Sequence, residues 1–104
     1  MSEVFRKLPS RDEFSAELNS RFRASTDNGP EIDLLLVRSE SLISNSVQES
    51  FSLLFLAPVE SQPIQNIYRL TNERLGDMDL LLVPVKKDES GLYYEAVFNH
   101  LVAK

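Results

Sequence analysis

The sequence predicts a mainly β fold: a small antiparallel sheet, strongly bent or partly closed into a barrel, of about five to six strands with one N-terminal helix. Apolar segments of strand length recur after residue 20, short turns separate most of them, and one capping motif precedes a helical apolar pattern. Short connections favour antiparallel neighbours, because a parallel pair needs a crossover of a dozen or more residues. A flat two-layer α+β arrangement is the alternative.

The helix is predicted near the N-terminus. Ser10 and Glu13 have the spacing of a capping box, in which each side chain bonds the backbone amide of the other residue. Phe14 and Leu18 follow four positions apart and form one apolar stripe. We therefore expect a helix over about residues 11–19, preceded by an N-terminal arm at 1–9.

The strands are predicted from alternation and from the turns between them. A central strand over Phe51–Leu56 is apolar on both sides, and Pro84 places the end of a later strand at a sheet edge or a bulge. Residues 39–50 are polar and serine-rich, which indicates a loop or the fraying end of a strand. The remaining strands are expected at residues 21–26, 32–37, 65–71, 78–85 and 92–98.

Composition bounds the domain organisation and the partners. The chain of 104 residues is one β-rich domain over 1–104, with 42% apolar and 26% charged residues. Its net charge of −5 argues against a nucleic-acid partner, because phosphate binding needs clustered Lys and Arg. No apolar segment approaches the roughly 20 residues that span a bilayer, so no membrane association is expected. The absence of cysteine is compatible with the cytoplasm.

Three predicted strands carry apolar side chains on both faces. The fully apolar faces are the expected core, and the opposite faces begin polar and then turn apolar. A helix about 10 Å across shields roughly two strands, so one helix is too narrow to cover this second set. The alternative is that the helix and residues 39–50 cover it within a monomer. We predict an interface for a protein partner or for self-association into a homo-oligomer, formed by Leu35, Val37, Leu54, Leu56, Leu81 and Val83.

No catalytic, cofactor-binding or metal site is predicted, and the chain is not expected to be an enzyme. His100 has no accompanying nucleophile motif and is expected at the surface. Asp77 and Asp79 share one strand face beside a turn, where two acids are usually solvated. Arg69 and Glu95 lie in predicted strands and would form a structural ion pair if those strands were neighbours.

From Phe51 onward the chain resembles a family of small bacterial domains of unknown function. The resemblance covers about half of the chain and depends on ordered short motifs: Phe51–Phe55, Gln65, Tyr68–Leu70, Leu75–Gly76, Leu82–Val85 and Gly91–Asn99. Such proteins look like accessories encoded near phage-tail-like or collar-type fibre proteins. The resemblance implies a structural or assembly role without a known reaction, in the cytoplasm or assembled into a phage-like particle.

Two classes of function follow from these observations. The first is a non-enzymatic protein-interaction or structural module, accessory to a phage-tail-like or surface-fibre assembly. The second is a small-molecule-binding β-barrel with a cavity lined by Tyr68, Tyr94 and Phe98. A tightly filled interior would count against the second class.

Overall fold

The computed structural model describes residues 8–27, 29–45 and 47–101. These residues form one short helix and six strands. The predicted arm at 1–9 lies mostly outside them, and Leu8 and Pro9 have no regular structure. In chain order the elements are α1 (Arg11–Ser15), β1 (Arg21–Ser25), β2 (Ile32–Ser44), β3 (Gln48–Ala57), β4 (Asn66–Asn72), β5 (Gly76–Asp88) and β6 (Gly91–Leu101).

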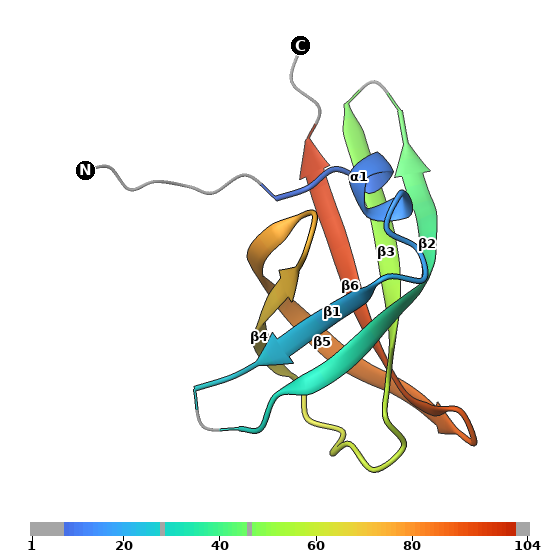
Figure 1. The fold of residues 1–104 in the computed structure, drawn as a ribbon. Coiled ribbons are helices and arrows are strands. Elements are labelled where there is room, and N and C mark those ends of the chain that lie inside the picture. Colours follow the sequence, from blue (N-terminus) through green and yellow to red (C-terminus); the bar gives the residue numbers. More distant parts are fainter. Residues whose placement is uncertain (1–7, 28, 46, 102–104) are drawn as a thin grey trace.

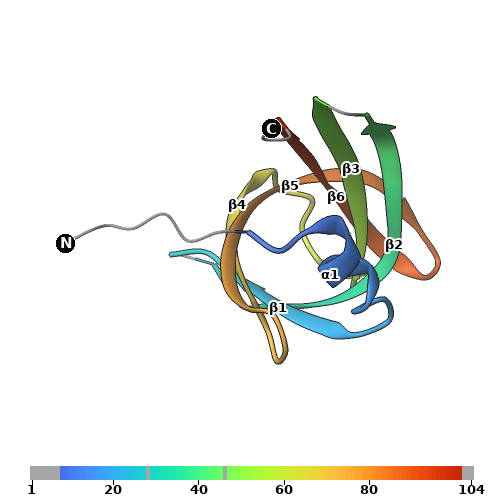
Figure 2. The same ribbon diagram turned by 90° about the horizontal axis from the view of Figure 1, so that it is seen from above.

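The strands form one antiparallel sheet that closes on itself in the order β1-β2-β3-β6-β5-β4. Two three-stranded meanders, β1-β2-β3 and β4-β5-β6, meet at two seams. One seam pairs β3 with β6 and the other pairs β1 with β4. The ring is an irregular barrel, because the upper parts of β2, β3 and β6 extend beyond it (Figures 1 and 2). The predicted mainly β fold is therefore confirmed, and the sheet closes.

The two longest strands bend around the barrel, so that each pairs with different neighbours along its length. The first residues of β2 pair with β1 and the rest pair with β3, with a register shift between Leu36 and Arg38. In the same way β5 pairs first with β4 and then with β6, with a shift between Pro84 and Lys86. Bulges of this kind increase strand bending. Pro84 accordingly lies beside a bulge, as the sequence predicted.

The prediction for residues 39–50 was only partly right. Most of this segment is a hairpin in which β2 continues to Ser44 and β3 begins at Gln48. The Asn45 side chain stabilises the turn, because its Oδ1 accepts hydrogen bonds from the backbone N–H groups of Val47 and Gln48, both at 2.9 Å. The polar composition reflects exposure on both faces of this protruding hairpin and not the absence of a strand.

The helix is shorter than predicted. Both bonds of the capping box form between Ser10 and Glu13, but α1 ends at Ser15. Asn19 has a φ of +70°, in the left-handed region that turns the chain into β1. The predicted stripe therefore contributes one core residue: Phe14 is fully buried, whereas Leu18 is 41% exposed.

The barrel interior is filled by side chains that include three aromatic groups along its axis. At the α1 end, Phe14 contacts Phe98, with ring centroids 5.4 Å apart, and Phe98 stacks on Phe51 at 4.6 Å. A pair in edge-to-face contact, Phe22 and Phe55, lies 5.2 Å apart. A third contact joins Tyr68 and Tyr94 at 5.8 Å. Helix α1 lies over one end of the barrel (Figures 1 and 2), and Phe14 is the aromatic side chain with which it closes that end.

Replacing Phe14 by Ala should lower the free energy of unfolding by about 3–5 kcal/mol, because the cavity at the barrel end cannot collapse onto a rigid ring of strands. Replacing Leu18 by Ala should change it by about 0.5 kcal/mol or less. Urea denaturation monitored by circular dichroism measures both. Equal effects of the two substitutions would contradict the assignment of Phe14 as the plug.

Candidate functional site

The outer surface of β2, β3, β6 and β5 places most of the predicted interface residues side by side. Leu35 pairs with Leu56 across β2 and β3, and Leu54 pairs with Glu95 across β3 and β6. Glu95 in turn pairs with Val83 of β5. Val37 lies at the β2 bulge, next to Arg38, the partner of Leu54. These side chains form a continuous band across four strands, which we call the outer face.

Residues of the outer face differ in exposure. Five of the predicted residues are half-buried: Leu35, Val37, Leu54, Leu56 and Val83. The sixth, Leu81, is 50% exposed and lies farther along β5, where it pairs with Ile67 of β4. Helix α1 covers the end of the barrel and leaves this face uncovered (Figures 1 and 2).

Sequence reasoning missed other apolar residues that face outward on the same strands. Ile67 is 62% exposed opposite Leu81, and Val97 is half-exposed on β6. Tyr93 pairs with Leu56, and the Lys86 ammonium lies 4.7 Å from the centroid of its ring. Alternation separates the two faces of β4 and β6 but does not by itself say which face is outward. These residues were missed because the prediction counted only strands whose second face was mostly aliphatic.

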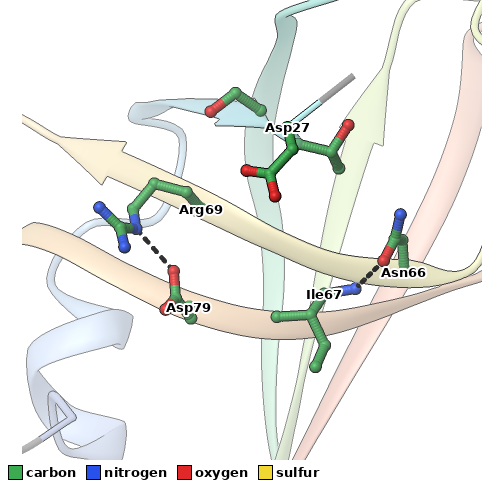
Figure 3. A pocket seen from close by; sticks show the side chains of 7 residues that line it. Asp27, Asn66, Ile67, Arg69 and Asp79 are labelled. Atoms are coloured by element: carbon green, nitrogen blue, oxygen red, sulfur yellow. Dashed lines mark hydrogen bonds and ion pairs between the residues drawn. The ribbon is translucent and has the colours of Figure 1, made fainter. Parts of the chain in front are cut away.

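A polar groove lies at the ends of β1 and β4 (Figure 3). It has a volume of about 610 Å³, and Arg69 and Asp79 form its ion pair, with 2.6 Å between Arg69 Nε and Asp79 Oδ1. Asp27 lies across the groove from this pair. The expected pairing of Arg69 with Glu95 is wrong, because β4 and β6 are not neighbours in the ring. Alternation identified the face of each residue but could not identify the neighbouring strand.

The ion pair in this groove links neighbouring strands β4 and β5 and is not suited to proton transfer. The hydrogen bond from Arg69 to Asp79, together with the charge of that carboxylate, raises the pKa of the guanidinium. Arg69 therefore stays charged over the whole physiological range. Both side chains are more than half exposed, so solvent screens this ion pair and it contributes little to stability.

The other end of the barrel, opposite α1, is closed by two tyrosines. The Tyr68 hydroxyl donates to the Ile64 carbonyl and the Tyr94 hydroxyl donates to the Gln62 carbonyl, each at 2.7 Å. Both rings are buried, and they hold the loop between β3 and β4 in place. Burial, and then the neighbouring Tyr94 hydroxyl, raises the pKa of Tyr68 to about 12.

The space that a cavity lined by Tyr68, Tyr94 and Phe98 would need is occupied by protein. The two tyrosine rings are in edge-to-face contact, and Phe98 is packed between Phe14 and Phe51. Phe98 also belongs to the opposite end of the barrel from the tyrosines. These three residues therefore do not line one internal site.

The structure offers no support for a metal centre among its described residues, where no group of three or more His, Cys, Asp or Glu side chains could hold an ion. Within the same residues, no helix is long and apolar enough to cross a membrane. The side chain of His100 lies outside the described part, so its expected surface position stays a prediction.

The raised pKa of Tyr68 predicts a stability change at high pH. In the unfolded chain a tyrosine loses its proton near pH 10, whereas Tyr68 in the folded protein keeps it until about pH 12. The contribution of Tyr68 to folding stability should therefore be constant below about pH 9 and fall between about pH 10 and 12, because only the unfolded state releases the proton there. Urea denaturation across this range measures the loss, and Tyr68→Phe should reduce the slope. An unchanged slope in that variant would contradict the assignment.

A family model described as a domain of unknown function (DUF6916) matches residues 9–98. The matched segment contains α1, β1 to β5 and most of β6. Searches of curated proteins and of solved structures found no significant match to the chain.

Proposed function

The chain belongs to the DUF6916 family of domains of unknown function. We propose that it is a non-enzymatic protein-interaction or assembly module. In this proposal the outer face of β2, β3, β6 and β5 binds a partner protein or a second copy of the chain. The family match carries no information about activity, so the support for this proposal comes from the side chains of the outer face.

The observation that carries the proposal is the set of apolar side chains that lie on one uncovered face. Leu35 is the register partner of Leu56, and Leu54 follows on the same face of β3. Val83 lies on the far side of β6, where Glu95 separates it from Leu54, and the exposed pair of Leu81 and Ile67 extends the same side of the sheet. Removing apolar surface from water is worth roughly 25 cal/mol per Å². A partner that covered these side chains would therefore gain favourable free energy without disturbing the barrel interior.

Charges on the outer face fit a protein partner better than a nucleic acid. Arg38 and Lys86 lie among Glu40, Glu95 and Asp88, so this face carries charges of both signs although the chain has a net charge of −5. Two copies, or one copy and another acidic protein, could meet here without the repulsion that their overall charges would produce. Nucleic acid and membrane partners are not part of the proposal.

The finer role, as an accessory of a phage-tail-like or surface-fibre assembly, comes from the sequence resemblance alone. An assembly protein needs a rigid body and a surface that contacts its neighbours. The closed ring of strands and the outer face meet these two needs. A location in the cytoplasm or within a phage-like particle is part of the same proposal.

The alternative, a small-molecule-binding barrel, is supported less well. It required an internal cavity between Tyr68, Tyr94 and Phe98, and these side chains are packed against other aromatic rings. An enzymatic role would need an acid/base pair in a concave site. The ion pair of Arg69 and Asp79 is solvated, and the Arg69 guanidinium stays charged, which does not suit that chemistry.

Replacing Leu81 by Glu should weaken association at least about tenfold, because a charge placed in an apolar contact must lose its hydration. Leu42 is the matched control: it is 51% exposed, close to the 50% of Leu81, but lies near the tip of the β2–β3 hairpin. Leu42→Glu should leave association unchanged. Sedimentation analysis over a range of concentrations measures self-association, and affinity capture from the native host followed by mass spectrometry measures a partner.

Two results would contradict the proposal. One is a monomer at high concentration that captures no partner and binds no apolar dye. The other is an equal loss of association in the Leu81 and Leu42 variants, which would point to a general effect of added charge.

A further inference from the structure

A pocket opens at the barrel end opposite α1, separate from the outer face. One wall is formed by residues that lead into β2 together with the first two residues of that strand, and the other is the loop between β3 and β4. The volume of the pocket is about 470 Å³. Pro30 and Ile32 belong to the first wall, Pro58 and Ile64 to the second, and Tyr68 of β4 lies between them. We call this the mouth pocket. Its size falls within the range of binding sites for small ligands or single side chains.

The second wall of the mouth pocket is fixed in place by the barrel itself. The hydroxyls of Tyr68 and Tyr94 donate to the carbonyls of Ile64 and Gln62, and the Ser61 amide donates to the Pro58 carbonyl at 3.0 Å. A wall that is already ordered loses little conformational entropy when a ligand binds. This wall of the pocket is therefore preformed.

Charges around the mouth pocket have one sign. Glu31 and Asp33 belong to one wall and Glu60 to the other, and none of the described lining residues is Lys or Arg. Arg23 lies outside the lining, 3.6 Å from both carboxylates of the first wall, so it offsets one of their two charges. Glu60 has no ion-pair partner among the described residues.

From this combination of apolar walls and carboxylates on both sides, we propose that the mouth pocket binds a lysine or arginine side chain from an extended segment of a partner protein. The aliphatic stem would contact Ile32, Ile64 and the edge of Tyr68, and the charged head would lie near Glu60. Long cationic side chains bind in this manner, with the stem in an apolar environment and the charge at its rim. An anionic ligand would meet three carboxylates and no lining cation.

A peptide fits the site better than a free amine because the apolar surface continues beyond the pocket. Val59 lies on the same loop as Ile64 but outside the lining of the pocket, and it is 45% exposed. A residue flanking the cationic side chain of a partner segment could cover Val59. The proposal concerns a different surface from the outer face, so either one can fail without the other.

The test is a titration of the full-length, isotope-labelled chain with the acetylated and amidated pentapeptide Ala-Leu-Lys-Leu-Ala, followed by NMR. The expected result is a set of amide shift changes at Glu31, Glu60, Ser61 and Ile64. Peptides with norleucine or Glu in place of Lys are the control ligands, and both should bind more weakly than the lysine peptide. The small cation n-butylammonium is the last probe, and it should bind more weakly than the lysine peptide.

Glu60→Gln should weaken binding of the lysine peptide about fivefold, the effect of losing one partly solvated ion pair. Glu73→Gln is the matched control, because it removes the same charge from the exposed β4–β5 turn near α1, where neighbouring Arg74 pairs with Glu17. That variant should bind within about twofold of the wild type, since charges at that distance are screened. Circular dichroism verifies that both variants fold.

Several outcomes would overturn the proposal. They are the absence of shifts at the pocket up to about 1 mM peptide, equal affinity for the norleucine peptide, and equal weakening by the two Gln variants. Shifts confined to the outer face around Leu54 and Val83 would overturn it as well. Binding of n-butylammonium that equals or exceeds binding of the lysine peptide would overturn the choice of a partner segment as the occupant.

Discussion

The pairing of β1 with β4 is the constraint on which the rest of the structure depends. The described residues contain no second sheet and no long helix to cover the first, so the sheet obtains an interior only by closing on itself. The Asn72 side chain supports this seam, because its Nδ2 donates to the Arg21 carbonyl and its Oδ1 accepts from the amides of Arg74 and Leu75. The same closure removes the free edges that β1 and β4 would otherwise expose.

Closure leaves two open ends, and the chain fills them in chemically different ways. At one end Phe14 enters from α1 and makes a contact that is apolar throughout. At the other end the rings of Tyr68 and Tyr94 are buried while their hydroxyls reach loop carbonyls. The plug at the first end is therefore a purely aromatic contact, whereas the second end has a polar boundary and an adjoining pocket. The outer face is a third environment, because its outward side chains have no second layer to cover them.

Local features of the sequence predicted most of the fold. Alternation placed Leu92, Tyr94, Ala96 and Phe98 on one face, and the structure buries all four in the barrel. The capping box was also predicted, because it depends on residues three positions apart. The predicted length of the helix was wrong because the helical spacing of apolar residues continues to Leu18, whereas only Phe14 packs into the core.

The candidate sites were less accessible to sequence reasoning, because they depend on which strands and loops become neighbours. Alternation assigns a residue to a face, but Arg69 could be matched to Asp79 only once β4 was known to lie beside β5. The mouth pocket has no periodic signal at all, since two irregular loops from different halves of the chain form it. The outer face was predictable in outline because side chains alternate between the two faces of a strand, and this alternation can be read from each strand alone.

The arrangement of two meanders joined at two seams also governs how the chain reaches this structure. Each meander forms from neighbouring segments, but both seams, β3 with β6 and β1 with β4, join residues that are far apart in the sequence. Neither half encloses a core alone, so an isolated half gains little free energy from its own hairpins. Folding that depends on such distant pairings is slow and cooperative, on the millisecond-to-second time scale of small β-barrels. Ribosomal synthesis must therefore be complete through β6 before the first meander has a partner to close against.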